Sequence, residues 1–263
     1  MTLFSIIKNN RLILVTAVCF LILTYLLLSF QMLFFKCIFT SKIWAHRVNS
    51  IEKFEEARKK FPGVELDLVF DSVKNNFDVN HPPANSIDLN LFDYLNSNKN
   101  YKNLGLWLDF KNLNVNNKIQ SSVKLDSIVR TLSIETANII VESNTPNFLN
   151  SFKSKGFKTS YYLPWEISSL KNEELSSELT FINNLIISRQ IDYISSDVID
   201  YKFMKEKFPY AEIITWIIDN PAPITNLYTF KVSVSSFIRN LKVLSDEDVK
   251  VVLFGFKAKA GNR

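Results

Sequence analysis

Short runs of β-branched and aromatic residues alternate with polar segments of helical period along most of the chain. These runs have the length and composition of buried strands, and they lie at residues 42–46, 64–70, 104–110, 138–142, 158–163, 193–196, 212–217 and 250–254. The segments between them predict helices at residues 49–61, 86–95, 117–132, 146–154, 166–189, 198–208 and 227–244. Strands that alternate with helices eight times in one domain predict a (β/α)8 TIM-type barrel over residues 43–263.

An open, doubly wound sheet is the structural alternative to a barrel. Its nucleotide-binding versions need a glycine-rich phosphate loop after the first strand. No such loop follows residues 42–46, and the whole chain has only 5 glycines. The pattern therefore favours the barrel.

The first helix is the best marked in the sequence. Asn49 has the side chain of an N-cap, and Glu52 follows it three residues later, which is the spacing of a capping box. Ile51 and Phe54 share one apolar face. Pro62 and Gly63 stop the helical pattern before the second strand.

Residues 12–35 carry no charge and are bounded by Arg11 and Lys36. A helix over this stretch would span about 36 Å, which is enough to cross the hydrocarbon core of a bilayer. The run is longer than the apolar region of a cleaved signal peptide, and no small-x-small cleavage site follows it. We therefore expect an uncleaved transmembrane signal anchor at residues 12–35, in contact with the lipid bilayer, after a short tail at residues 1–11.

The orientation of this anchor is less clear from the charges, because basic residues lie on both of its sides. A short N-terminal tail followed by a long domain is typical of a signal anchor that exports its C-terminal part. We expect a single-pass membrane protein with the barrel domain of residues 43–263 on the extracytoplasmic side.

The net charge of +5 comes from the region of the anchor. Residues 1–47 hold five of the 31 Lys and Arg residues and none of the 26 Asp and Glu residues, so the remainder has 26 of each sign. This balance gives no argument for nucleic-acid binding. The two cysteines, Cys19 and Cys37, lie in or beside the apolar segment, so the barrel contains no disulfide framework. The oligomeric state is not indicated by the sequence.

Candidate chemistry gathers where the first three predicted strands end. Glu65 and Asp67 are two residues apart on the second strand and therefore point to the same face. His46 ends the first strand, His81 lies in the loop after the second, and Asp109 lies near the end of the third. In a barrel of this kind, the active site forms at the carboxyl ends of the strands.

The residue types at this rim indicate attack at phosphorus. Three carboxylates without cysteine suit a hard divalent cation, Mg²⁺ or Ca²⁺. Two imidazoles suit a general base and a general acid, and the cationic Arg47 and Lys111 suit the charge of a phosphoryl group. Trp216, near the end of the seventh strand, is a candidate wall for the alcohol part of a substrate. Each residue alone also has a purely structural interpretation, and the combination favours catalysis.

The pattern His46-Arg47, Glu65-Leu66-Asp67 and then His81 resembles the signature of glycerophosphodiester phosphodiesterases. The segments WAHRVNS, VELDLVF, HPP and LWLDFKNL are nearest to the menorin-like branch of this phospholipase C-like superfamily. The resemblance implies a barrel in which His46 and His81 are the acid and base and Glu65, Asp67 and Asp109 bind the metal. It further implies that Lys111 and Arg47 contact the phosphate. The chain has Val48 where the common pattern has glycine after His-Arg, and Asp109 where glutamate is frequent.

Three functions remain open at this stage. The first is a metal-dependent phosphodiesterase, a hydrolase of lipid metabolism, that acts on a glycerophosphodiester or a phospholipid headgroup by hydrolysis or by cyclising transfer. The second is a non-catalytic, membrane-anchored barrel that binds a phosphate-containing ligand. The third is a glycosidase-like barrel, which is disfavoured because Glu65 and Asp67 lie too close on one strand to flank a glycosidic bond.

Overall fold

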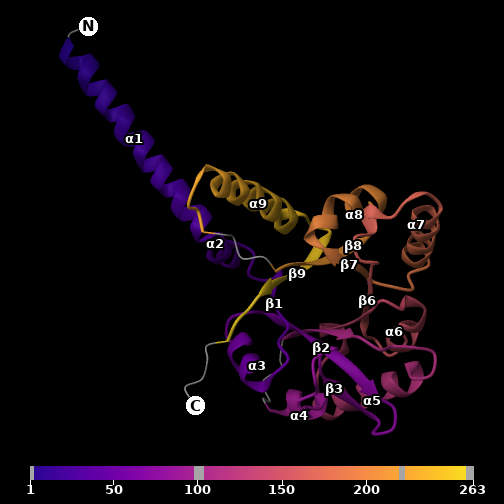
Figure 1. Cartoon of the computed structure of the whole chain (residues 1–263). Coiled ribbons are helices and arrows are strands. Elements are labelled where there is room, and N and C mark those ends of the chain that lie inside the picture. The colour runs from indigo at the N-terminus through magenta and orange to yellow at the C-terminus, as the bar shows by residue number, and fades with distance from the viewer. Residues whose placement is uncertain (1–2, 98–103, 219–222, 259–263) are drawn as a thin grey trace. The chain divides into compact units, whose positions relative to one another are not determined.

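Eight parallel strands close into a barrel in the computed structural model, which describes residues 3–97, 104–218 and 223–258. The first strand pairs with both the second and the last, and these two pairings close the sheet. An eight-stranded parallel barrel with surrounding helices, as in a TIM barrel, is therefore confirmed (Figure 1). The barrel strands are β1 (Ile43–His46), β2 (Gly63–Asp71), β4 (Gly105–Phe110), β5 (Ile139–Ser143), β6 (Lys158–Tyr162), β7 (Tyr193–Asp197), β8 (Glu212–Ile217) and β9 (Val249–Gly255).

Helices follow the strands in the order that the pattern predicts, and α3 to α8 lie outside the ring of strands (Figure 1). The predicted segment at residues 166–189 begins with a short 3-10 turn, Ile167–Ser169, before its α-helix. The helices are α3 (Ile51–Ala57), α4 (Leu91–Asn96), α5 (Lys118–Thr131), α6 (Asn150–Lys153), α7 (Asn172–Ile187), α8 (Tyr201–Lys207) and α9 (Leu227–Ser245).

One strand was not predicted from the sequence. β3 (Asn76–Val79) runs antiparallel to β2 and pairs Leu68 with Val79. The tight turn before it places Asn75 at a φ of 48°, a left-handed conformation that asparagine tolerates. Four residues are too few for a periodic signal, so this strand depends on its pairing with β2.

Trp44 of β1 sets the spacing of the strands that carry the acidic residues. Its indole lies against Gly63 and Gly105, which are paired in register on β2 and β4. A Cβ atom would lie 2.2 Å from the indole at Gly63 and 2.1 Å from it at Gly105. Only glycine therefore fits at these two positions, and the start of each strand is fixed against the same ring.

The first barrel helix is capped by a different residue from the one predicted. The N-cap of α3 is Ser50, whose Oγ accepts a hydrogen bond of 3.2 Å from the backbone N–H of Lys53. Asn49 is not the cap. Its side chain turns instead toward β2, where it contacts Asp67.

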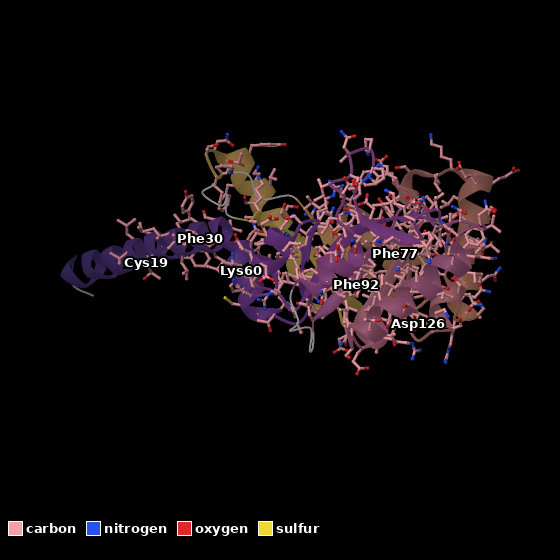
Figure 2. The ribbon with its side chains drawn as sticks, turned by 90° about the horizontal axis from the view of Figure 1, so that it is seen from below. Cys19, Phe30, Lys60, Phe77, Phe92 and Asp126 are labelled. Atoms are coloured by element: carbon pink, nitrogen blue, oxygen red, sulfur yellow. The ribbon has the colours of Figure 1, made fainter. Side chains whose placement is uncertain are left out.

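The described residues fall into two compact units, Met1–Thr40 with Asp219–Lys242, and Ser41–Ile218 with Val243–Arg263. The first unit contains α1 (Leu3–Ser29), α2 (Gln31–Ile38) and most of α9. The side chains drawn along α1, around the labelled Cys19 and Phe30, are mostly carbon (Figure 2).

The single straight span predicted at residues 12–35 is not confirmed. The helix ends at Ser29, and α2 leaves it at an angle of 76°. The amide of Gln31 donates to the carbonyl of Leu28 at 3.2 Å, which competes with the regular backbone ladder at this break. Within the described part of the chain, no single helix is long and apolar enough to cross a membrane. The bent pair Ile13–Ser29 and Gln31–Ile38, taken together, has the length and the apolar composition that a span requires.

Candidate active site

The strand register brings the predicted residues to one mouth of the barrel. Asp67 of β2 lies beside Asp109 of β4, Asp109 lies beside Glu142 of β5, and Glu142 lies beside Ser160 of β6. Four neighbouring strands therefore present polar side chains at one level. A cavity of about 240 Å³ opens there, and its lining includes every residue that the sequence predicts for the site, namely His46, Arg47, Glu65, Asp67, His81, Asp109, Lys111 and Trp216.

Three carboxylates form a buried cluster in this cavity. Glu65, Asp67 and Asp109 each offer an oxygen atom, and these atoms lie within 4.8 Å of one another. Glu65 is 3% exposed and Asp67 is 1% exposed. Burial and the negative charges of Asp67 and Asp109 hold the pKa of Glu65 well above its usual range, and burial also raises the pKa of Asp109. An all-oxygen donor set with this deficit of positive charge fits a hard divalent cation.

The segment directly after β1 holds this cluster in place. The backbone N–H of Arg47 donates to Glu65 Oε2 at 2.6 Å, and the N–H of Val48 donates to the carbonyl of Glu65 at 2.8 Å. Arg47 has a φ of 51°, in the left-handed region. Such a conformation costs about 1 kcal/mol or more outside glycine, so the contacts with Glu65 must offset it. Val48 is fully buried, and its carbonyl accepts a hydrogen bond of 2.7 Å from the hydroxyl of Tyr94.

Asn49 braces the second carboxylate in a similar way. Its Nδ2 donates to Asp67 Oδ2 at 2.6 Å, and its Oδ1 accepts from the backbone N–H of Asp67 at 3.0 Å. These two bonds orient the carboxylate toward the cavity. Asn49 was predicted to be the helix cap, because an asparagine before a helix gives the same sequence signal in both roles.

The two imidazoles lie on either side of the acidic cluster. His46 Nε2 is 3.6 Å from Glu65 Oε2, and His81 Nε2 is 4.0 Å from Asp67 Oδ1. Burial and the nearby charge of Arg47 lower the pKa of His46 to about 4, so this ring is neutral at pH 7. Arg47 Nη2 donates to His81 Nε2 at 2.8 Å, and this contact requires the lone pair of that nitrogen.

Two lysines complete the electrostatics of this side. Lys111 Nζ lies 2.8 Å from Asp67 Oδ1 and also contacts Asp109. Burial opposes the charge of Lys111, but the two carboxylates hold its pKa above the usual range. Lys53 of α3 donates to the carbonyls of His46, at 3.1 Å, and Arg47. Lys53 was not predicted to act here, since a lysine on a helix normally reaches solvent.

The opposite side of the cavity combines the carboxyl groups of Glu142 and Asp197 with hydroxyl and aromatic groups. Glu142 is 2% exposed and accepts a hydrogen bond of 2.9 Å from Ser160 Oγ. Burial and the charge of Asp109 raise its pKa to about 8. Trp216 and Tyr162 meet edge to face, with ring centroids 5.3 Å apart. Glu142 ends the fourth strand predicted from the sequence, which places it near the mouth, and the register adds that it lies next to Asp109.

Residues 39–143 match the menorin N-terminal domain. This match confirms the predicted resemblance of this part of the chain to the menorin-like branch. The matched residues contain β1 to β5 and therefore all of the predicted site except Trp216. No curated protein gives a significant match to the chain.

Solved structures of phosphodiesterases are similar in fold to this chain. A glycerophosphodiester phosphodiesterase from Parabacteroides distasonis is 15% identical, with a TM-score of 0.53 over 82% of this chain and 92% of that chain. A phosphodiesterase from Oleispira antarctica, solved in complex with the product sn-glycerol-3-phosphate, is 10% identical, with a TM-score of 0.55 over 82% of this chain and 93% of that chain. At these identities the likeness establishes the fold, which is the fold of glycerophosphodiester phosphodiesterases.

Proposed function

We propose that the protein is a metal-dependent phosphodiesterase that acts on a glycerophosphodiester or on a phospholipid headgroup. The observation that carries this proposal is the composition of one cavity. Two buried carboxylates and the partly buried Asp109 bring oxygen atoms within 4.8 Å of one another, and two imidazoles and two cationic side chains flank them. A binding site for a neutral ligand would not concentrate so many charges away from water, because each buried charge needs a partner.

Glu65, Asp67 and Asp109 would hold the divalent cation. Such a cation, when bound, polarises a phosphoryl oxygen and offsets the charge of the transition state. Arg47 and Lys111 line the same cavity and are the residues that we expect to contact the phosphate. Lys111 already lies within 2.8 Å of Asp67, so its ammonium group is held where a phosphate on the cluster would meet it.

The two histidines would move the protons. His46 is neutral at pH 7 and can therefore accept a proton from the attacking hydroxyl, whether this belongs to water or to the substrate. As the new P–O bond forms, the P–O bond to the leaving alcohol breaks, and His81 would donate the proton that this alcohol needs. For this step His81 must carry a proton on Nε2 as well, which becomes possible when the substrate phosphate draws the Arg47 guanidinium away from that nitrogen. Arg47, at 2.8 Å from His81 Nε2, keeps that ring oriented toward the cavity.

The remaining wall of the cavity suits an alcohol group. Trp216 is 8% exposed and is held edge to face against Tyr162. A cavity of about 240 Å³ has room for a small headgroup, and a fully enclosed diacyl lipid would exceed it. We infer that the phosphate and its polar alcohol enter the cavity, and that any acyl chains stay outside.

We also propose that the protein is attached to a lipid bilayer through residues 12–35, with the barrel on the extracytoplasmic side. Large apolar side chains are exposed in series along α1 and α2, from Ile13, at 66%, to Ile38, at 54%. Helices that face water do not expose a continuous apolar surface of this kind. A substrate derived from lipids would then be present at the same surface.

The full-length protein in detergent tests the catalytic proposal. Release of alcohol from a panel of glycerophosphodiesters and lysophospholipids is measured with Mg²⁺, with Ca²⁺ and with chelator. We expect turnover that requires the cation and that falls by about 10²- to 10⁴-fold in His46→Ala. Lys158→Ala, at an exposed lysine of β6 outside the cavity, is the matched control and should keep full activity.

The contact of Lys111 with two of the three carboxylates favours one alternative function. A cluster that is already partly neutralised in this way could bind a phosphate-containing ligand without turnover. An active His46→Ala enzyme would contradict the proposed mechanism. Cation or phosphate binding in a thermal-shift assay, with no turnover of any substrate, would replace it with the binding function.

A further inference from the structure

Helix α9 is apolar on two opposite faces. One face packs inside the unit that it shares with α1 and α2. The ring centroid of Phe237 lies 5.1 Å from that of Phe35, on which it stacks, and 5.8 Å from that of Phe34. Ser233 and Asn240 are buried on this side, at 2% and 3% exposed. The packing requirement of an amphipathic helix is thus met by this face alone.

The other face is exposed and yet also apolar. Its large side chains recur at spacings that place them on one half of the helix, and they are Leu227 (69% exposed), Tyr228 (75%), Val232 (42%), Ile238 (61%) and Leu241 (37%). At 100° per residue, the exposed Lys231 and Lys242 lie among them. A helix that is apolar on both sides is not expected to face water, so something of matching chemistry must cover this half.

The charges of the segment identify what covers it. Residues 220–245 contain Lys231, Arg239 and Lys242 and no Asp or Glu. An apolar surface that carries only positive charge complements an anionic bilayer surface, where lysine stems lie along the acyl boundary and their ammonium groups reach the headgroups. Tyr228, with an apolar ring and a polar tip, is a residue type that is enriched at this depth. A protein partner would instead be expected to select an apolar core with few lysines.

We propose that α9 is a second membrane-contacting element, which lies in the plane of an anionic bilayer with Leu227, Val232 and Ile238 in the acyl boundary and Lys231 and Lys242 at the headgroups. It belongs to the same compact unit as the apolar α1 and α2. This inference extends the proposed attachment through residues 12–35 and is independent of the catalytic assignment. Attachment at two elements restricts the rotation of the protein on the membrane, which a single span does not do.

The test uses the full chain with Cys19 and Cys37 replaced by Ser, so that one new cysteine can carry an environment-sensitive dye. The dye is placed by Ile238→Cys on the exposed face of α9, or by Ile187→Cys on α7, where the native side chain is 79% exposed. Each protein is reconstituted into phosphatidylcholine vesicles with phosphatidylglycerol. We expect a blue-shifted dye at Ile238→Cys that lipids spin-labelled near the headgroup quench several-fold more than the dye at Ile187→Cys.

Charge reversal sharpens the result. Lys231→Glu together with Lys242→Glu should reduce the quenching at position 238 by at least half, and phosphatidylcholine vesicles without the anionic lipid should do the same. The matched control is Lys59→Glu with Lys158→Glu, two exposed lysines of the other unit. This control should leave the quenching unchanged.

Three outcomes would overturn the inference. A dye at Ile238→Cys that stays in water, in protein that still floats with the vesicles, leaves the attachment through residues 12–35 intact and removes α9 from the membrane. A blue shift without quenching by lipid shows that another protein chain covers this face. Loss of flotation altogether contradicts the proposed attachment as well, while the phosphodiesterase assay reports on catalysis separately.

Discussion

The two halves of the barrel mouth treat buried carboxylates in opposite ways. At the ends of β1, β2 and β4, Glu65 and Asp67 accept hydrogen bonds from a backbone N–H and from Asn49, and Lys111 lies against Asp67 at 2.8 Å. At the end of β5, Glu142 is equally buried, but its hydrogen-bond partner is the neutral hydroxyl of Ser160. We call the first half the charged half, because its carboxylates lie among the cationic Arg47 and Lys111. We call the second the neutral half, because Glu142 there lies among hydroxyl and aromatic groups, although Asp197 also lines this side.

This difference decides what each half can do. A buried carboxylate that keeps its charge needs cations and oriented N–H groups close by, and the same features let it bind a metal and a phosphate. A buried carboxylate that keeps its proton needs only hydroxyl partners, and it can line a cavity beside the aromatic ring of Trp216 without attracting a cation. The charged half therefore supplies the chemistry, and the neutral half supplies the shape of the site.

Glu142→Gln tests whether Glu142 is neutral in the folded protein, and it has the largest expected effect. With a pKa of about 8 in the folded protein and 4.5 in the unfolded chain, Glu142 keeps its proton on folding at pH 7 while the unfolded chain has lost it. Its contribution therefore destabilises the protein above pH 4.5, by about 1.4 kcal/mol per pH unit, until the pH reaches about 8. Gln imitates the protonated form, so the variant should gain about 3 kcal/mol at pH 7 and nothing near pH 4.5.

Urea unfolding of both proteins at several pH values, with chelator present, measures this gain. Glu174→Gln, at an exposed residue of α7, is the matched control and should stay within about 0.5 kcal/mol of the parent protein. A gain that does not change with pH would mean that Glu142 ionises normally. In that case the second half of the mouth would be charged as well.

The same contrast explains what could be predicted from the sequence. The strands of the barrel are apolar runs, and β8 was predicted with its observed bounds, Glu212–Ile217. The charged half was predicted because its members recur at a spacing of two residues. Glu65 and Asp67 lie on one strand, and Lys111 follows Asp109 just beyond the end of β4. Such pairs are visible as short motifs.

The rest required the fold. The environment of Glu142 is set by Asp109 and Ser160 on the neighbouring strands, which lie 33 and 18 residues away in the sequence. Asn49 satisfies the rules for a helix cap, and only the position of β2 reveals that its amide faces Asp67. The break after Ser29 coincides with a side-chain bond from Gln31 to the carbonyl of Leu28, inside an otherwise uniform apolar run. Each of these roles arises from contacts that local patterning does not contain.

Asn49→Ala tests whether the charged half depends on its bracing. The variant removes the bond to Asp67 Oδ2 and the bond from the Asp67 N–H. Loss of such an outer partner of a metal ligand typically costs about 10- to 100-fold in metal affinity or activity. We expect a loss of this size in kcat/KM at subsaturating Mg²⁺, with a decrease of about 1–3 kcal/mol in the free energy of unfolding.

Asn112→Ala is the matched control for this variant. Asn112 also braces β2 by two bonds. Its Oδ1 accepts from the backbone N–H of Phe70 at 2.8 Å, and its Nδ2 donates to the backbone carbonyl of Phe70 at 3.0 Å, so neither bond involves a carboxylate. It should show the loss of stability and keep its affinity for the cation. Equal losses of cation affinity in both variants would show that Asn49 acts only through the stability of β2.

The smallest effect is expected at the wall of the neutral half. Trp216→Phe keeps an aromatic ring beside Tyr162 but removes part of the surface that faces the cavity. If the neutral half supplies only shape, substrate and transition state lose the same contact. KM should then rise by roughly fivefold, about 1 kcal/mol, while kcat stays the same. Steady-state kinetics on the preferred substrate measures both constants, with Tyr210→Phe, at a side chain that is 93% exposed, as the control. A fall in kcat with an unchanged KM would place Trp216 in the chemical step, and the division between a charged half that reacts and a neutral half that shapes would then be wrong.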